Sequence, residues 1–491
     1  MSTYKHGTYG HYNESIGAVP SKTKTVAVYI GTAPVNLVAG YAEKGLVGRP
    51  ISVSNYAGAL SSLGYSADWA SFSLCEAIKV NLNNPLGNVA PIIFINVLDP
   101  DAHRAAEATA VSLAFTGGSA VIESDKIILD TLTLGDYVLG VDYTIAYNFA
   151  SGKLTITSIG ETPITGVVEA SYYEVDPAAV TAEDIVGYAT DEGTYAGLGA
   201  VDLIYQTHTA ITSLLDAPGW SHIPAVYEAM LAKASQINGH WDAFVVADIP
   251  VADGDSRVDT IALAKKWQTD NGYINHNSKV CWPQFMGSSG EVYHGSTLCA
   301  WTMLVTDNTH DGVPMETPSN KQIPVVRQYF GEGSANAGFD QTNANTLNEV
   351  GITTGVYWGG RWVLWGPHTA AYRFGATADA KYIFDNNVRM MMYVLNSFQS
   401  EWGTTVDKPL TRALKDTILN REQQKADALA AMGAFIGKPV VRFVEGENSV
   451  ADLMEGNFEW SFVGTPTPPA KSLTIGVAYT SEGFNSYYEE A

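Results

Sequence analysis

The chain has 491 residues, which is too long for one ordinary hydrophobic core and predicts two to four domains. Its 51 Asp and Glu residues outnumber its 28 Lys and Arg residues, and the formal net charge of −23 argues against direct nucleic-acid binding. Apolar residues make up 46% of the chain, a fraction typical of folded proteins and not of disordered ones.

The N-terminal quarter combines a polar segment with an α/β pattern. Residues 1–22 are rich in Gly, Tyr and His and keep no strand or helix period, so they are either a frayed terminus or an arm ordered by a neighbour. Residues 23–114 predict the first part of an α/β domain, with a strand at 25–30 and a helix at 68–80. The nearly continuous apolar run at 91–97 is typical of a strand buried on both faces.

The middle of the chain changes character twice. Residues 115–177 contain short strands rich in Ile, Val, Thr and Tyr between turn residues, which predicts a compact all-β domain inserted into the α/β domain. Residues 178–345 return to alternating strands and helices, which implies a mostly parallel, layered sheet. Here Asp255 and Ser256 are expected to cap a helix whose apolar stripe begins at Val258.

Residues 346–470 predict a C-terminal α+β domain. An aromatic, Gly-rich hairpin is expected at 356–365, followed by a helix at 385–402 and a second helix that begins at 407–409 and runs to about residue 435. The expected core face of the first helix consists of Val388, Met391, Met392 and Leu395.

Two strands are predicted near the end of this domain. Residues 458–462 alternate aromatic and polar side chains and can pair with a strand at 439–444. Residues 464–469 include three prolines, which favour an extended spacer. The side chains expected to form the sheet are Val441, Phe443, Phe458, Trp460 and Phe462.

Residues 471–491 predict a C-terminal arm that contains one more strand. Its apolar residues alternate with small and polar ones, which is the period of a strand. A strand held at a chain terminus by a proline spacer has unpaired backbone groups and must pair with its own sheet or with the sheet of another chain. The alternating residues are Leu473, Ile475, Val477 and Tyr479.

The motifs expected of an enzyme are weak. Residues 433–439 resemble a phosphate loop, but the glycine spacing is one residue short and Pro439 replaces the magnesium-binding hydroxyl. The sequence therefore predicts no enzyme and no cofactor. Four His and Asp residues lack the spacing of a metal site and are expected to be polar residues of surface loops: His294, His310, Asp307 and Asp311.

Cysteine usage and hydropathy bear on the compartment. Cys75, Cys281 and Cys299 form no C-x-x-C pair, so we expect buried, reduced thiols. The chain shows no signal-peptide pattern and no run of eighteen apolar residues, which predicts a protein made in a cytosol, without stable membrane insertion.

Basic residues cluster on the second C-terminal helix. Arg412 and Lys415 are three residues apart and Arg421 and Lys425 four apart, so each pair shares one side of the helix. The cluster is either a solvated face beside neighbouring acidic residues or a contact strip for an acidic partner.

Short motifs follow one another in the last third of the chain. They are Leu347-Asn348-Glu349, Gly351-Ile352-Thr353-Thr354, Gly360-Arg361, Trp365-Gly366, Thr369, Val406-Asp407-Lys408-Pro409, Thr411, Leu414, Leu453, Gly456, Pro466, Pro468, Pro469, Leu473 and Thr474. Their order resembles that of the tail sheath proteins of contractile bacteriophages, of phage-like bacteriocins and of contractile injection systems. The N-terminal segment 26–34 and the strand at 91–97 fit the same family.

This resemblance implies a structural, non-enzymatic subunit with a layered α/β sheath core, an inserted β domain, and a C-terminal α+β domain with N- and C-terminal arms. Such subunits stack as hexameric rings around an inner tail tube and contract to drive the tube through the host envelope for genome delivery. The implied partners are other copies of the chain, the tube protein, and the baseplate and tail terminator proteins. The implied location is the virion tail sheath, assembled in the host cytoplasm.

The resemblance also implies roles for two sets of residues. Arms of neighbouring subunits would add strands to the C-terminal domain, a joint held by backbone hydrogen bonds. The helix after Pro409 would face the tube, which makes Arg412, Lys415, Arg421 and Lys425 candidate tube contacts.

Three other functions stay open at this stage. The chain could form the sheath of a bacteriocin-like or other contractile injection particle. It could be an α/β enzyme with a β accessory domain, for which a bound cofactor would be the evidence. It could also be another self-assembling virion surface protein, which images of its assemblies would distinguish.

Overall fold

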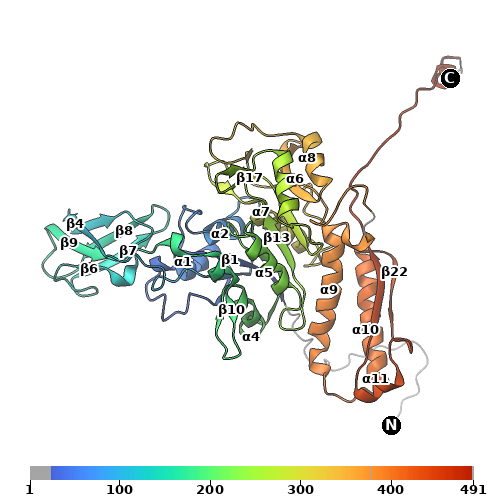
Figure 1. Cartoon of the computed structure of the whole chain (residues 1–491), viewed down its shortest axis with the longest axis horizontal. Coiled ribbons are helices and arrows are strands. Elements are labelled where there is room, and N and C mark those ends of the chain that lie inside the picture. Colours follow the sequence, from blue (N-terminus) through green and yellow to red (C-terminus); the bar gives the residue numbers. More distant parts are fainter. Residues whose placement is uncertain (1–23, 377–378, 489–491) are drawn as a thin grey trace, which may run out of the picture.

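The computed structural model describes residues 24–376 and 379–488, and the predicted N-terminal arm at 1–22 lies outside them. The molecule is elongated (Figure 1). A small β domain lies at one end, α/β layers form the centre, and a pair of long helices stands at the other end. The C-terminal segment leaves the body as an extended stretch of chain without secondary structure up to Thr480.

An eight-stranded sheet forms the centre, in the order β2-β3-β1-β12-β13-β16-β20-β21. The six inner strands run parallel, and the two edge strands, β2 and β21, run antiparallel to their neighbours. The strands are β1 (Lys24–Gly31), β2 (Pro50–Val53), β3 (Ile92–Asn96), β12 (Ala210–Asp216), β13 (Phe244–Asp248), β16 (Ser278–Cys281), β20 (Ile352–Trp358) and β21 (Arg361–Trp365).

Helices cover this sheet, and its inner strands are largely buried. β3 and β13 are buried at every residue, as expected for parallel strands with helices on both faces. We call the sheet and its helices the α/β core. The helices are α1 (Tyr56–Leu63), α2 (Leu74–Leu82), α3 (Ala182–Val186), α4 (Ile204–His208), α5 (Pro224–Ala234), α6 (Ile261–Asp270), α7 (Gly295–Asn308) and α8 (Gln341–Asn348).

Three small sheets accompany the core. β17 (Gln284–Met286) pairs with β18 (Val292–Tyr293) and with β19 (Arg327–Tyr329). The other two are hairpins, β10 (Tyr188–Ala189) with β11 (Tyr195–Ala196) and β14 (Ala252–Asp253) with β15 (Ser256–Arg257).

The β domain consists of two three-stranded sheets with a hydrophobic cluster of their own. In one sheet β9 lies between β4 and β6, and in the other β8 lies between β5 and β7. The first strand starts at Thr109, so the predicted boundary at residue 115 is too late, because β4 pairs along its full length with β9. The strands are β4 (Thr109–Phe115), β5 (Ser119–Ile122), β6 (Thr133–Leu134), β7 (Tyr143–Asn148), β8 (Lys153–Ser158) and β9 (Gly166–Tyr172).

The C-terminal part contains two long helices and a two-stranded sheet, which we call the linking unit. α9 (Asp385–Trp402) and α10 (Arg412–Ala431) lie side by side, and β22 (Phe435–Arg442) packs against α10 (Figure 1). β23 (Ser461–Pro466) pairs antiparallel with β22, and α11 (Val450–Glu455) lies between the two strands in sequence.

Several sequence-based expectations need correction. The hairpin at 352–365 extends the central sheet, so the predicted domain boundary at 346 falls inside the α/β core. Residues 464–466 belong to β23 and not to a free spacer, because they reach back to pair with Phe435 and Ile436. Leu395 is 52% exposed instead of buried, because the core-facing stripe of α9 lies around Val388 and Met392.

Helix starts were also placed too early by the sequence. α2 starts at Leu74 instead of 68, and α10 starts at Arg412, where the Thr411 side chain accepts a hydrogen bond from the backbone N–H of Leu414. Asp255 and Ser256 do not cap α6 but lie in the β14–β15 hairpin. The N-cap of α6 is Thr260, which accepts from Leu263 N–H at 3.3 Å.

Candidate assembly interface

The C-terminal arm is fully accessible. Leu473, Ile475, Val477 and Tyr479 are 84–89% exposed, and Figure 1 shows their segment leaving the body. Within the described residues, none of 472–479 makes a hydrogen bond. The arm thus combines unpaired backbone with a strand-like row of apolar side chains, which is costly in water unless a partner covers it.

The β22–β23 sheet lies beside the base of this arm. Val441 pairs with Phe462 and Val440 with Val463, with a bulge between Ile436 and Val440. Phe462 packs on Phe435, with ring centroids 5.2 Å apart. The opposite face of the β22–β23 sheet carries Val463 and Ile436, which are both more than half exposed. The sheet is therefore covered by helices on one face only.

The two outer edges of this sheet differ. The Gln423 side chain of α10 accepts a hydrogen bond from Val441 N–H at 2.9 Å and donates one to Pro439 O at 3.0 Å. Because Val441 turns its backbone groups toward Gln423, they point away from β23, and this edge of β22 is occupied. Pro439 also lacks an N–H. By the same alternation, the backbone groups of Phe462 point outward from β23, where a further strand can pair.

The five predicted acceptor side chains fall into two groups. Val441 and Phe462 lie in the paired strands. Phe443, Phe458 and Trp460 lie in the segment 443–460 that connects the two strands. The strands pair at 435–442 and 461–466, so the paired region lies further from this connection than the aromatic alternation indicates. Trp460 contacts the rings of Phe443 and Phe398 and so ties the end of the sheet to α9.

The predicted basic strip of α10 is largely neutralised within the chain. Arg421 and Lys425 both bind Glu401 of α9. Lys415 binds Asp416 at 2.8 Å. Within the described residues Arg412 has no ion-pair partner, and its side chain is exposed. The two pairs with Glu401 join α10 to α9. The basic strip therefore offers less unpaired positive charge than the sequence indicates.

A buried polar cluster at the carboxyl edge of the central sheet was missed by the sequence analysis. His294 Nδ1 lies 2.7 Å from Glu76 Oε2, and the His294 backbone N–H donates to Oε1 of the same carboxylate at 2.6 Å. Burial alone would lower the pKa of His294, but the charge and hydrogen bond of Glu76 raise it to about 9. Burial and neighbouring Asp248 hold the pKa of Asp216 well above its usual range.

The expectation of surface-loop polar residues is therefore wrong at two positions. His294 pairs with Glu76, and Asp307 binds Arg389, so neither is a free loop side chain. Their partners are more than 80 residues away in sequence, so a local sequence pattern could not predict these contacts. The three cysteines are buried, as expected, and no disulfide joins them in the structure.

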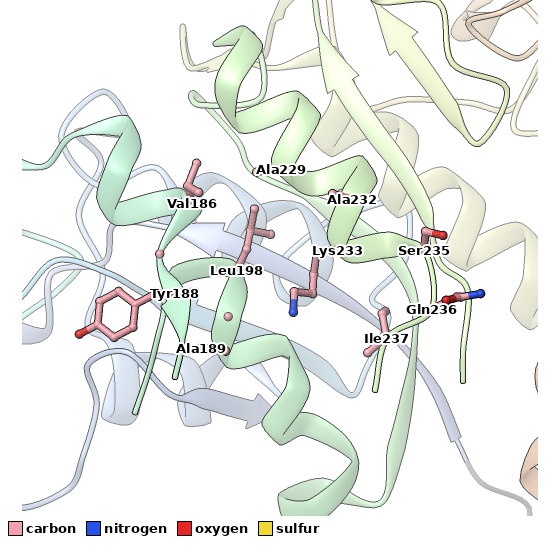
Figure 2. A pocket seen from close by; sticks show the side chains of 12 residues that line it. Val186, Tyr188, Ala189, Leu198, Ala229, Ala232, Lys233, Ser235, Gln236 and Ile237 are labelled. Atoms are coloured by element: carbon pink, nitrogen blue, oxygen red, sulfur yellow. The ribbon is translucent and has the colours of Figure 1, made fainter. Parts of the chain in front are cut away.

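A pocket of about 320 Å³ lies between the C-terminal turn of α5 and the β10 segment (Figure 2). Mostly small apolar side chains line it, among them Ala229, Ala232 and Leu198. Its charged lining residue, Lys233, donates to Asp202 at 2.7 Å. The charged side chain of the pocket is therefore already held by an ion pair.

Two searches of the described residues were negative. Residues 24–376 and 379–488 bring together no group of three or more His, Cys, Asp or Glu side chains fit to bind a metal ion. Over the same residues, every helix is too short or too polar to span a membrane.

No protein-family model matches the chain, but comparison with curated sequences gives two relatives. A tail sheath protein of Burkholderia phage BcepMu is 26% identical over 501 residues, which cover 98% of each chain. A tail sheath protein of Escherichia phage P2 is 24% identical over 304 residues, covering 60% of this chain and 70% of that protein.

Solved structures share the fold at low sequence identity. A chain of the six-fold symmetrised anti-feeding prophage baseplate matches with a TM-score of 0.54 and 13% identity, covering 97% of this chain and 99% of that one. The PVC sheath complex of an extracellular contractile injection system in its contracted state matches at 0.53 and 10%, covering 97% and 100%. A sheath tail protein of Desulfitobacterium hafniense matches at 0.52 and 10%, covering 93% and 100%.

These comparisons define the class as sheath proteins of contractile tails and injection systems, and they confirm the resemblance stated from the sequence. The similarity to two phage tail sheath proteins supports a contractile sheath subunit.

Proposed function

We propose that this subunit polymerises through strand exchange. The C-terminal arm of one copy pairs with the open edge of β23 in a neighbouring copy, and repetition of this joint builds hexameric rings that stack around an inner tail tube. The observation that carries the proposal is the arm itself, whose four alternating apolar side chains are 84–89% exposed next to a sheet with one open edge.

The joint suits a sheath that contracts. Backbone hydrogen bonds hold the added strand, and the residues between Thr467 and the strand can change direction without breaking them. Contraction then drives the tube through the host envelope for genome delivery. The baseplate would start the contraction and a terminator protein would close the far end, in a virion tail assembled in the host cytoplasm.

The tube is a further proposed partner. If α10 faces it, Arg412 is the side chain of the basic strip best placed to reach an acidic tube surface, since the other three are held by Glu401 or Asp416. We assign no catalytic role to the chain, and its relatives by sequence are sheath proteins.

Deletion of residues 472–491 tests the proposal most directly. We expect the truncated protein to fold but to form no rings or tubes in negative-stain images, because the strand that links copies is gone. A matched pair of variants separates strand pairing from chain length. Ile475→Asp with Val477→Asp should block assembly, while Thr474→Ser with Thr480→Ser should not. Tubes of normal length from the truncated chain would contradict strand exchange.

A further inference from the structure

Helix α9 has two faces of different chemistry. On one side Met390, Met391 and Val394 pack into the apolar cluster beneath β22 and β23. The other side faces the α/β core and is mixed, with only two buried apolar side chains among its contacts. Spaced at helical intervals along this side are Asp385, Val388, Arg389, Met392 and Asn396.

The first polar contact is an ion pair without solvent access. Lys279 of β16 and Asp385 of α9 bind each other, and both side chains are 0% exposed. The Lys279 ammonium also donates to Gly366 O at 2.7 Å and to His368 O at 3.2 Å. The Thr317 hydroxyl donates to the same Asp385 oxygen at 2.9 Å. All three protons of the ammonium therefore have acceptors.

The second ion pair lies one helical turn further along. Arg389 makes a two-pronged contact with Asp307 at the end of α7, with Nη1 3.2 Å from Oδ1 and Nη2 bound to Oδ2. Two turns beyond, the Asn396 amide donates to Asp242 O at 2.8 Å and accepts from Asp242 N–H at 3.1 Å. Three directional contacts thus follow one side of α9.

Such contacts differ from apolar packing in what they constrain. The hydrophobic effect has no direction, so apolar packing alone specifies the orientation of a helix less sharply than a directional contact does. A charge in a dry site must keep its partner, because removing one partner leaves the other buried and unpaired. A planar guanidinium on a carboxylate adds angular selectivity.

We propose that Lys279, Asp385, Asp307 and Arg389 are positioning residues that fix the orientation of the linking unit on the α/β core. Their effect on assembly rests on the function proposed above, since the linking unit carries both the acceptor edge and the arm. With α9 held at three turns, the arm leaves each subunit in one direction, and the subunit transmits motion to its neighbours without bending at this joint.

The test measures orientation in the full-length monomer. Spin labels at Lys266→Cys on α6 and Met454→Cys on α11 report one distance across the joint, since both sites are exposed and the three native cysteines are buried. The double substitution Lys279→Met with Asp385→Leu removes the first ion pair but keeps the site filled, a replacement that buried pairs often tolerate. We expect its distance distribution to broaden or shift by more than the wild-type width.

Controls keep the outcome decisive. Lys321→Met with Glu316→Leu removes a half-exposed pair of the core and should leave the distribution unchanged. If the first double variant fails to fold, Arg389→Met with Asp307→Leu asks the same question at the second pair. An unchanged distribution in the folded double variants overturns the proposal. That result would leave strand exchange untouched, whereas assembly of the arm-deleted chain would overturn strand exchange and leave the joint standing.

Discussion

The sheets of the α/β core and of the linking unit differ in how completely their faces and edges are covered. In the core, β3 and β13 are buried at every residue and antiparallel strands close both sheet edges. In the linking unit, helices cover one face of a two-stranded sheet, and Val463 and Ile436 on the other face stay exposed. Gln423 occupies the outer edge of β22, and among the described residues no strand pairs with the outer edge of β23. A two-stranded sheet is marginal alone.

The difference shows where the molecule is complete and where it needs neighbours. The core has antiparallel strands at both sheet edges and a large buried apolar cluster within one subunit. Among the described residues, the outer edge of β23 and the C-terminal arm of the same subunit have no strand partner. In the proposed strand exchange, the arm of one copy would fill the edge of another, which is a heterologous contact that repeats.

Substitutions in the two sheets should therefore lower the free energy of unfolding by different amounts. Phe244→Ala in β13 removes a fully buried ring between two covered faces and should lower the free energy of unfolding by about 3–5 kcal/mol. Phe462→Ala in β23 removes a partly exposed ring and should cost less than half as much in the monomer. Chemical denaturation of both variants measures this. Equal costs would remove the contrast between the regions.

The core contains a polar pair, His294 and Glu76, that should make the free energy of unfolding depend on pH. The raised pKa of His294, about 9, means that the folded protein keeps a proton that the unfolded chain releases above about pH 6.5. This contribution to stability is full below about pH 6.5 and is lost as pH rises through about 9, with a slope of at most about 1.4 kcal/mol per pH unit.

Unfolding measured from pH 6 to pH 10 checks this, with Glu76→Gln as the control. Without the carboxylate the pKa of His294 should fall, and the slope in that window should flatten. A wild-type slope that persists in Glu76→Gln would assign the dependence to other groups.

The occupied edge of the linking sheet can be opened. Gln423→Ala removes both hydrogen bonds to β22 and should destabilise the monomer by about 1–2 kcal/mol. Assembly should survive, because the arm is expected at the β23 edge. A clear gain in tube formation would instead point to an arm on β22, because the substitution frees that edge.

The smallest expected effect tests the corrected start of α6. Thr260→Ala removes the N-cap hydrogen bond to Leu263 N–H and should cost about 1 kcal/mol. Asp255→Ala lies in the hairpin before the helix and should cost much less. Thermal unfolding of the two variants compares them, and the reverse order would restore Asp255 as the cap.

Local patterns predicted single elements whose type depends on the order of their own side chains. The apolar run at 91–97 gave a buried strand at Ile92–Asn96, and the predicted helix at 385–402 matches α9 at both ends. Patterns failed where a distant segment decides. The hairpin at 352–365 joins the central sheet because β20 pairs with β16, some 70 residues earlier, and periodicity carries no information on such pairings.

The candidate site divides in the same way. The alternation of Leu473, Ile475, Val477 and Tyr479 is visible in the sequence, and so is the scarcity of catalytic motifs. The blocked edge at Val441 is not, because it depends on how α10 aims Gln423. The basic strip of α10 was visible, but its neutralisation by Glu401 depends on the packing of α9 beside it.

The sequence by itself determined the apolar runs of the core, the insertion of a β domain and a terminal strand without an assigned partner, because each depends on the order of side chains along a short segment. Only the tertiary structure decided which edge is open and which charges are buried. Lys279 and Asp385 are 106 residues apart, and their interaction exists because the fold excludes water between them. A charge in a sequence says nothing of its surroundings until packing has set them.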